Sequence, residues 1–229
     1  MKTYCINNGY KCNLDAYGKP FPFFDHEHDA STYQIRVYEF AKRVIQKYGG
    51  KNVLDIGCGY GIKLKEIILP LCKDIVGIDG KHAIDFCVKN HDFGRWFEDD
   101  IENPQLDLKE TFDVIICSDV IEHLLHPDNL LNYVKRHSHQ ETHIVISTPA
   151  RDRLPGSSSL GPPKNKVHVR EWSRKEFFAY VSINGFIILR HFLVGEAKIS
   201  LRKIVRKILL RESLRKIQVV FCKVKTDPI

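Results

Sequence analysis

The sequence feature that most constrains the fold is an apolar segment that ends in three glycines at alternate positions. Residues 53–61 read Val-Leu-Asp-Ile-Gly-Cys-Gly-Tyr-Gly, which places Gly57, Gly59 and Gly61 where a buried strand would turn into a helix. Glycines let a ligand approach the backbone, and the N–H groups that begin a helix favour a carboxylate or phosphate. Dinucleotide-binding folds would also need a glycine at position 62, where Ile62 stands. The turn predicts a ligand site at a strand end, although a tight turn without a ligand has the same pattern.

Strand and helix patterns alternate along most of the chain. An amphipathic helix is expected over residues 31–47, ending at Gly49 and Gly50, and another over 173–183, with Ser173 as N-cap and Glu176 at the third helical position. Such alternation predicts an α/β fold with a doubly wound, mostly parallel, seven-stranded sheet that binds ligands at the carboxyl ends of its strands. Strands are expected at 53–56, 75–78, around Trp96, and at 112–117, 143–147, 186–194 and 217–224, with a helix at 62–69.

Length and composition fit one globular domain. The 229 residues are 43% hydrophobic and 28% charged, and the formal net charge of +7 leaves the partner open, because it suits a phosphate-bearing substrate, nucleic acid or an anionic surface equally. We expect an N-terminal extension over residues 1–30 and one domain over 31–229. Neither a signal peptide nor an apolar membrane span is apparent in the sequence, so a cytoplasmic protein is expected.

Seven cysteines occur without a C-x-x-C pair, which is typical of reduced thiols. A zinc site from Cys5, Cys12, His26 and His28 is a weaker alternative, because neither spacing is one that structural zinc modules use.

An acid stands at the tip of the next predicted strand. Residues 76–79 read Val-Gly-Ile-Asp, and Asp79 could accept hydrogen bonds from both hydroxyls of a ribose. Together with the glycine turn, this pattern resembles the class I methyltransferases that use S-adenosylmethionine (SAM). The resemblance spans the chain from about residue 31 to 186 and implies a Rossmann-like methyltransferase sheet. It also implies a set of cofactor-binding residues: Asp55, Gly57, Gly59, Gly61, Asp79, Gly80, Asp100, Ile101 and Ser118.

Two polar clusters follow the fourth and fifth predicted strands. Residues 118–123 read Ser-Asp-Val-Ile-Glu-His; residues 147–149 read Ser-Thr-Pro and are followed, beyond a long loop, by His-Val-Arg-Glu-Trp-Ser at 168–173. For any one of these residues taken alone a structural role is favoured, with Asp119 or Glu122 capping the following helix and His123 packing at the surface. The pair of clusters resembles two groups of enzymes. The closer resemblance is to methyltransferases linked with glycan and exopolysaccharide synthesis, which carry the pattern Gly-Pro-Pro-x-Asn-x-x-His-Val-Arg-Glu-Trp seen at 161–172. The second is to small-RNA 3′-terminal 2′-O-methyltransferases. The RNA enzymes imply divalent-metal ligands at Asp119, Glu122, His123 and His168, although those enzymes have Glu where Asp119 stands.

The chemistry of an alcohol acceptor fits these residues. A sugar hydroxyl must lose its proton during methyl transfer, and a cation such as Mg or Mn, bound by His and carboxylate ligands, would acidify it. Without a metal, His123 or His168 would act as a general base. We expect a SAM-dependent O-methyltransferase that acts on a sugar, nucleotide-sugar or glycan hydroxyl. The alternatives are methylation of an RNA 3′ end, and a non-catalytic SAM-binding partner subunit.

Two segments each allow more than one interpretation. The loop over residues 150–167, with Arg151 and Arg153 at its start and Lys164 and Lys166 at its end, either closes over a polar acceptor or is a solvated surface loop. Residues 196–216 form a basic amphipathic insertion. Packing of its apolar face on the core is favoured over contact with a membrane surface or RNA.

Overall fold

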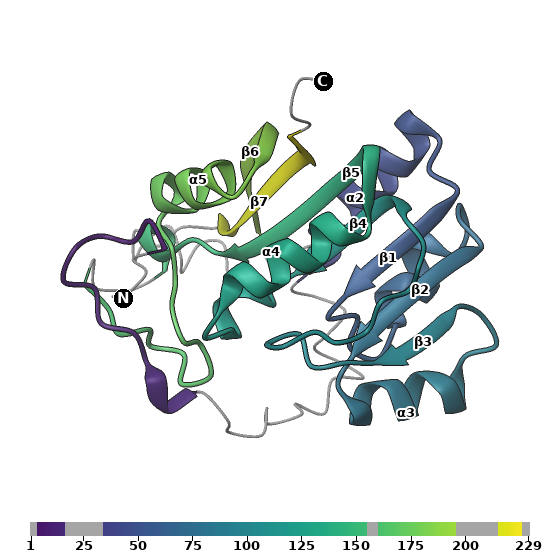
Figure 1. Cartoon of the computed structure of the whole chain (residues 1–229), viewed down its shortest axis with the longest axis horizontal. Coiled ribbons are helices and arrows are strands. Elements are labelled where there is room, and N and C mark those ends of the chain that lie inside the picture. Colours follow the sequence, from purple (N-terminus) through teal and green to yellow (C-terminus); the bar gives the residue numbers. More distant parts are fainter. Residues whose placement is uncertain (1–3, 17–33, 155–159, 196–214, 226–229) are drawn as a thin grey trace, which may run out of the picture.

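The computed structural model describes residues 4–16, 34–154, 160–195 and 215–225, and its centre is a seven-stranded sheet (Figure 1). The strand order is β3-β2-β1-β4-β5-β7-β6, and β7 lies antiparallel between β5 and β6 while the other pairs of neighbours are parallel. The predicted mostly parallel, doubly wound α/β sheet is therefore confirmed. The strands are β1 (Asn52–Ile56), β2 (Asp74–Asp79), β3 (Arg95–Glu98), β4 (Phe112–Ser118), β5 (Ser138–Pro149), β6 (Phe186–Gly195) and β7 (Arg215–Val224).

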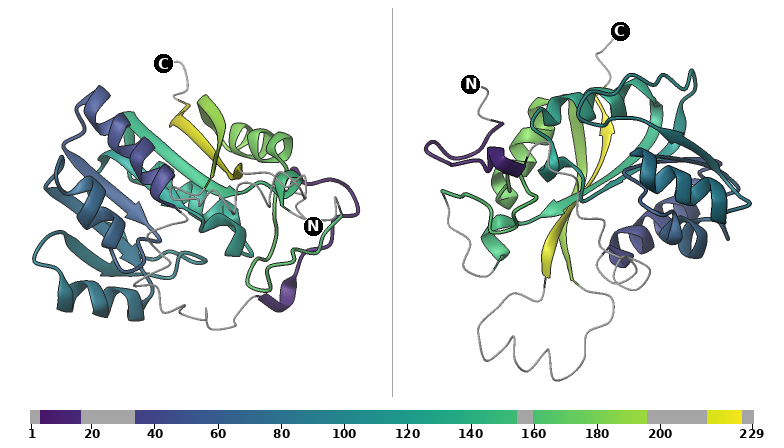
Figure 2. Two further views of the ribbon diagram at one scale, coloured as in Figure 1. Left: turned by 180° about the vertical axis from the view of Figure 1, so that it is seen from behind. Right: turned by 90° about the horizontal axis from the view of Figure 1, so that it is seen from below.

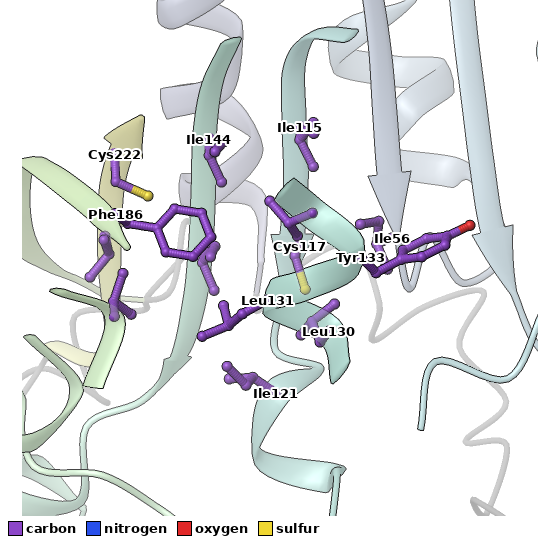
Figure 3. Close-up of a cluster of buried hydrophobic side chains, with 14 of the residues drawn as sticks. Ile56, Ile115, Cys117, Ile121, Leu130, Leu131, Tyr133, Ile144, Phe186 and Cys222 are labelled. Atoms are coloured by element: carbon purple, nitrogen blue, oxygen red, sulfur yellow. The ribbon is translucent and has the colours of Figure 1, made fainter. Parts of the chain in front are cut away.

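Helices cover both faces of the sheet, because side chains of its central strands alternate between two cores. In β4, Val114 and Ile116 pack on one side and Ile115 and Cys117 on the other. Helices α4 (Pro127–Arg136) and α5 (Arg174–Ile183) cover the face seen in Figure 1, and Figure 3 shows the core beneath α4. The opposite face, seen from behind in Figure 2, is covered by α2 (Ile35–Tyr48), a π-helical turn (Leu64–Ile68) and α3 (Lys81–Asn90).

The helix ends follow the capping signals in the sequence. Helix α2 ends at Gly49, whose φ of 75° is left-handed and whose N–H donates to Ile45 O. Helix α5 begins with a reciprocal capping box between Ser173 and Glu176, as expected. The α2 cap lies just before the amino end of β1, whereas the α5 cap follows directly on the polar segment at 168–172.

Two segments that are distant in sequence lie side by side next to this edge. The N-terminal strap (residues 4–16), which includes a 3-10 turn at Leu14–Ala16, packs against the His168 segment (residues 160–172), as Figures 1 and 2 show in purple and green. Two further 3-10 turns, Ile121–His123 and Arg151–Arg153, follow β4 and β5.

Most of the basic insertion predicted over 196–216 lies outside the described residues. Its last two residues, Arg215 and Lys216, belong to β7, so the insertion ends earlier than the sequence pattern suggested. None of the helices in the described ranges is long and apolar enough to cross a membrane.

Candidate functional site

The glycine turn after β1 leaves open space beside its backbone. Gly57, Gly59 and Gly61 all have left-handed φ angles, of 79°, 57° and 68°. A Cβ atom on Gly57 would lie 2.2 Å from Val120 Cγ2, whereas a Cβ on Gly59 would meet nothing within 4 Å. Gly57 is therefore required by packing, and Gly59 borders a space that a ligand can enter.

Asp79 at the tip of β2 is bonded to both sides of this space. Its Oδ2 accepts from the N–H of Gly59 over 2.7 Å, and its Oδ1 accepts from the N–H of Gly80 over 2.7 Å. Burial raises the pKa of the Asp79 carboxyl, and the two amide bonds oppose that shift. Each carboxylate oxygen can accept a second hydrogen bond. The residues thus fit a ribose, whose two hydroxyls would donate to Asp79 beside the open backbone at Gly59 and Gly80.

Asp55 lies beneath the turn and is fully buried. Its Oδ2 accepts from the Tyr38 hydroxyl of α2 over 2.7 Å, and burial raises the pKa of Asp55 to about 7. Lys63, which the sequence analysis missed, is also buried here, and burial lowers the pKa of its amine while the carboxylates of Asp55, Asp119 and Asp79 oppose that shift. Only its position two residues after the glycine turn could have indicated it. These groups form a buried layer of ionisable side chains under the glycine turn.

The remaining predicted cofactor residues lie along the same edge. Asp100 follows β3, and its Oδ1 accepts from the Glu102 N–H over 3.0 Å, while the Asp99 N–H donates to Asp79 O over 3.1 Å. Ile101 packs against the core under α4. Ser118, at the end of β4, shares a 3.0 Å hydrogen bond with the hydroxyl of Ser147 on β5. The ends of β1, β2, β3 and β4 therefore form one continuous edge.

The structure brings Glu122, His123 and His168 together at the end of β4. One ligand atom from each of the three lies within 4.8 Å of the others. Glu122 is fully buried, and burial raises the pKa of its carboxyl. Its Oε2 accepts from the Thr148 hydroxyl over 2.9 Å, but its Oε1 is buried without a hydrogen-bond partner in the part of the chain that the structure describes. Because a buried, unbonded carboxylate oxygen is costly, this atom fits a cation ligand.

Both histidines are oriented through their Nδ1 atoms. His123 Nδ1 donates to Val167 O over 2.8 Å, and burial lowers the pKa of His123 to about 3, so the ring is neutral and its Nε2 carries the lone pair. His168 Nδ1 lies 2.7 Å from Glu171 Oε1, and its Nε2 lies 2.9 Å from Asn165 Nδ2. A carboxylate or carbonyl on the far nitrogen is the usual support of a metal-binding histidine. Glu171 and Asn165 are further site residues, to which the sequence alone assigned no role although both lie within three residues of His168.

Asp119 lies outside this three-residue cluster. Its φ of 56° turns the side chain so that Oδ1 accepts from the Ser147 hydroxyl over 2.7 Å and Oδ2 accepts from Gln34 Nε2 over 3.4 Å. The four-residue set implied by the small-RNA enzymes is thus a group of three in this structure. Asp119 instead joins β4, β5 and the start of α2.

The start of the long loop does not present Arg151 to an acceptor. Arg151 is buried, its Nη1 donates to Glu171 O over 2.6 Å, and its Nη2 binds both carboxylate oxygens of Glu176. Arg151 is therefore held by partners within the protein, and closure of the rest of the loop over an acceptor stays a prediction. The alternative zinc site is not assembled from the described residues, because His26 and His28 lie outside them, while Cys5 and Cys12 are half-buried thiols.

Comparison with known proteins agrees with this geometry. The family model described as "Methyltransferase domain" matches residues 33–190, more than half of the chain. A SAM-dependent methyltransferase from Clostridium acetobutylicum superposes with a TM-score of 0.66 at 13% identity, covering 88% of this chain and 96% of that one. The plantazolicin methyltransferase in complex with S-adenosylhomocysteine superposes with a TM-score of 0.62 at 19% identity, covering 93% and 94%. At these identities the likeness shows the fold.

Curated relatives include enzymes with two kinds of acceptor. A ubiquinone biosynthesis O-methyltransferase of Proteus mirabilis is 28% identical over 109 residues, covering 45% of this chain and 44% of that protein. A small RNA 2′-O-methyltransferase of Mus musculus is 27% identical over 162 residues, covering 61% of this chain and 39% of that protein. The chain spans less than half the length of the curated relatives it matches.

Proposed function

The chain belongs to the methyltransferase-domain family, and from this premise we propose its reaction. We propose that this SAM-dependent methyltransferase methylates a hydroxyl oxygen of a sugar with the help of a divalent cation. The observation that carries the proposal is the cluster of Glu122, His123 and His168, which contains a buried carboxylate oxygen without a hydrogen-bond partner among the described residues. The cluster follows β4, at the edge where the cofactor residues of β1 and β2 also lie.

The cofactor half would bind and orient the methyl donor. Asp79 would accept from the ribose hydroxyls, and Gly59 and Gly80 would let the backbone approach the cofactor closely. SAM supplies a methyl group on a sulfonium, and its transfer needs the acceptor oxygen in line with the carbon–sulfur bond. The task of the protein at this step is therefore alignment.

The acceptor half would bind the metal and the acceptor. Glu122, through its carboxylate, and His123 and His168, each through a ring nitrogen, offer a mixed oxygen and nitrogen set that suits Mg, Mn or another first-row ion. A bound cation would act as a Lewis acid toward a hydroxyl. Two neighbouring hydroxyls would bind such a cation better than one, so a vicinal diol of a sugar is the preferred acceptor.

A simple general base is the competing mechanism. His123 would be a poor general base, because burial lowers its pKa to about 3 and a group with so low a pKa accepts a proton weakly. His168, held between Glu171 and Asn165, would be the base in that case. Two measurements separate the mechanisms. If a chelator abolishes activity, the metal is required; if activity persists in the chelator and only one histidine variant is inactive, that histidine is the general base.

An RNA 3′ end is the second candidate acceptor. The observation that favours it is the match to small RNA 2′-O-methyltransferases, which covers 61% and 63% of this chain, against 43% to 47% for the ubiquinone enzymes. A terminal ribose also carries a vicinal diol, so the same cluster would serve. A non-catalytic partner subunit is disfavoured because the acceptor cluster is intact.

The test is SAM turnover against nucleotide sugars, glycans and short RNAs with free 3′ ends. We expect turnover on a diol acceptor, loss of turnover in EDTA, and recovery on adding Mn²⁺, while SAM stays bound throughout. A matched acceptor that lacks one hydroxyl of the diol should be inactive. Full turnover in EDTA would exclude the metal, and turnover on RNA alone would exclude the sugar.

A further inference from the structure

The N-terminal strap bonds to the His168 segment on both sides of His168. The Asn13 N–H donates to Val169 O over 2.8 Å, and Asn13 Nδ2 donates to Lys166 O over 3.0 Å. One strap residue therefore fixes the backbone before and after this histidine, although it is more than 150 positions away in the sequence.

Tyr10 reaches the same segment from the other side of the strap. Its hydroxyl accepts from the Glu171 N–H over 3.0 Å, and its ring lies 4.6 Å from the Arg151 guanidinium. Glu171 is the residue whose carboxylate orients the His168 ring. The fit is tight, because a Cβ on Gly161 would lie 2.4 Å from Lys11 O and 2.8 Å from the Tyr10 ring.

The His168 segment in turn bonds to the other two members of the cluster. Val167 O accepts from His123 Nδ1, and the N–H groups of Val169 and Arg170 donate to Glu122 O over 2.9 and 3.2 Å. A shift of this segment would change the position of His168 and remove the support of His123 at once.

We propose that the N-terminal strap is a positioning element of the acceptor site, in which Tyr10 and Asn13 keep His168 at the distance from Glu122 and His123 that cation binding requires. This inference rests on the proposed function. It extends the acceptor site to residues that lie before the matched methyltransferase domain, which begins at residue 33. The strap acts through His168 and Glu171 and does not itself touch substrate.

The test uses the full chain with Tyr10→Phe and Asn13→Ala combined. Asn7→Ala is the matched control, because Asn7 is exposed in the same strap and bonds to Glu176 through its backbone N–H. We expect solvent exchange of the Val169 and Arg170 amides to become about tenfold faster, and Mn²⁺ affinity, measured with the metal alone, to fall about tenfold. SAM affinity should change by less than about twofold, since Tyr10 and Asn13 bond to the His168 segment and not to Asp79 or the glycine turn.

The readouts separate failure of the strap from failure of the metal. Unchanged amide exchange, or faster exchange with unchanged Mn²⁺ affinity, would overturn the positioning role. If the unmodified protein binds no Mn²⁺, the metal part of the proposed function is wrong. The positioning role of the strap is then tested by the NMR shifts of the His168 imidazole nitrogens, and equal shifts in the unmodified protein and the double variant would overturn it. If the double variant does not fold, Tyr10→Phe is tested alone, since it keeps the ring over Arg151. Exchange of the Val169 and Arg170 amides should then be about threefold faster, and Mn²⁺ affinity about threefold weaker.

Discussion

The cofactor half and the acceptor half of this edge are built in different ways. In the cofactor half, the turn after β1 and the tip of β2 are neighbours in the sheet, and the bond from Gly59 N to Asp79 joins residues only 20 positions apart. In the acceptor half, His123 bonds to Val167 across 44 positions, and Glu171 bonds to Tyr10 across 161. The proposed cofactor site would thus be encoded in two consecutive strand ends, whereas the proposed acceptor site needs three distant segments to meet.

This difference predicts that the two halves can be damaged separately. Mutations in the acceptor half should abolish methyl transfer and leave SAM bound, and mutations in the cofactor half should weaken SAM binding and leave the metal cluster formed.

Glu122→Gln should give the largest loss. It keeps the shape of the side chain but removes the charge from the buried group that would hold the cation, so turnover should fall about 1000-fold. SAM affinity, measured by calorimetry, should stay within about twofold. Glu66→Gln is the matched control, because Glu66 is exposed on the π-helical turn (Leu64–Ile68). Parallel loss of SAM binding in the Glu122 variant would show that the halves are not independent.

Asp55→Asn should change how stability depends on pH. Burial raises the folded-state pKa of Asp55 from 3.8 to about 7, so the stability it contributes is complete below about pH 4 and is lost as pH rises to about 7. Between about pH 4 and pH 7, the free energy of unfolding of the unmodified protein should therefore fall by roughly a few kcal/mol. In the Asp55→Asn variant the free energy of unfolding should lack this dependence on pH.

Urea unfolding at several pH values between 4 and 8 measures this effect. Asp85→Asn, at an exposed site on α3, is the control and should keep the slope. A slope that persists in the Asp55 variant would assign it to another group, and would show that the layer under the glycine turn does not hold a neutral carboxyl.

Asp79→Ala should weaken SAM binding about 10- to 100-fold, because two charge-assisted hydrogen bonds to the ribose would be lost. Mn²⁺ affinity at the acceptor cluster should be unchanged, since Asp79 lies at the end of β2 and makes none of the contacts of His123 or His168. Calorimetry with each ligand measures both. Unchanged SAM affinity in a folded variant would reject the ribose role of Asp79.

The same contrast explains how much could be predicted from the sequence. Most elements of the sheet were predicted to within a few residues, because their apolar periodicity is local. Strand β5 begins at Ser138, five residues before the expected start at residue 143, because its polar first residues lack that pattern. They are held by pairing with Phe112, whose carbonyl also accepts from the Thr142 hydroxyl over 2.6 Å.

For the site as well, the features that could be predicted are those carried by local sequence motifs. Glycines and acids at strand ends are visible as motifs, and the sequence analysis paired the two polar clusters that the structure brings together. It could not foresee that the left-handed φ of Asp119 directs its carboxylate to Ser147 and Gln34, because that depends on the packing of three elements. The roles of Lys63 and Tyr10 were missed for the same reason, since no local pattern marks a residue whose partners are distant in sequence.

The smallest effect is expected from Thr148→Val, which removes a single supporting contact. Thr148 is buried on β5 and donates its hydroxyl to Glu122 Oε2 over 2.9 Å, so valine preserves the volume and leaves a second Glu122 oxygen without that donor. Loss of such a support should weaken Mn²⁺ affinity and turnover about tenfold, with SAM affinity unchanged. Thr142→Val is the matched control, because Thr142 is equally buried on β5 but bonds to the Phe112 carbonyl, away from the cluster. Equal losses of Mn²⁺ affinity and turnover in both variants would mean that the threonines of β5 act only through protein stability. A loss confined to Thr148→Val would mean that the Thr148 hydroxyl supports cation binding by orienting Glu122.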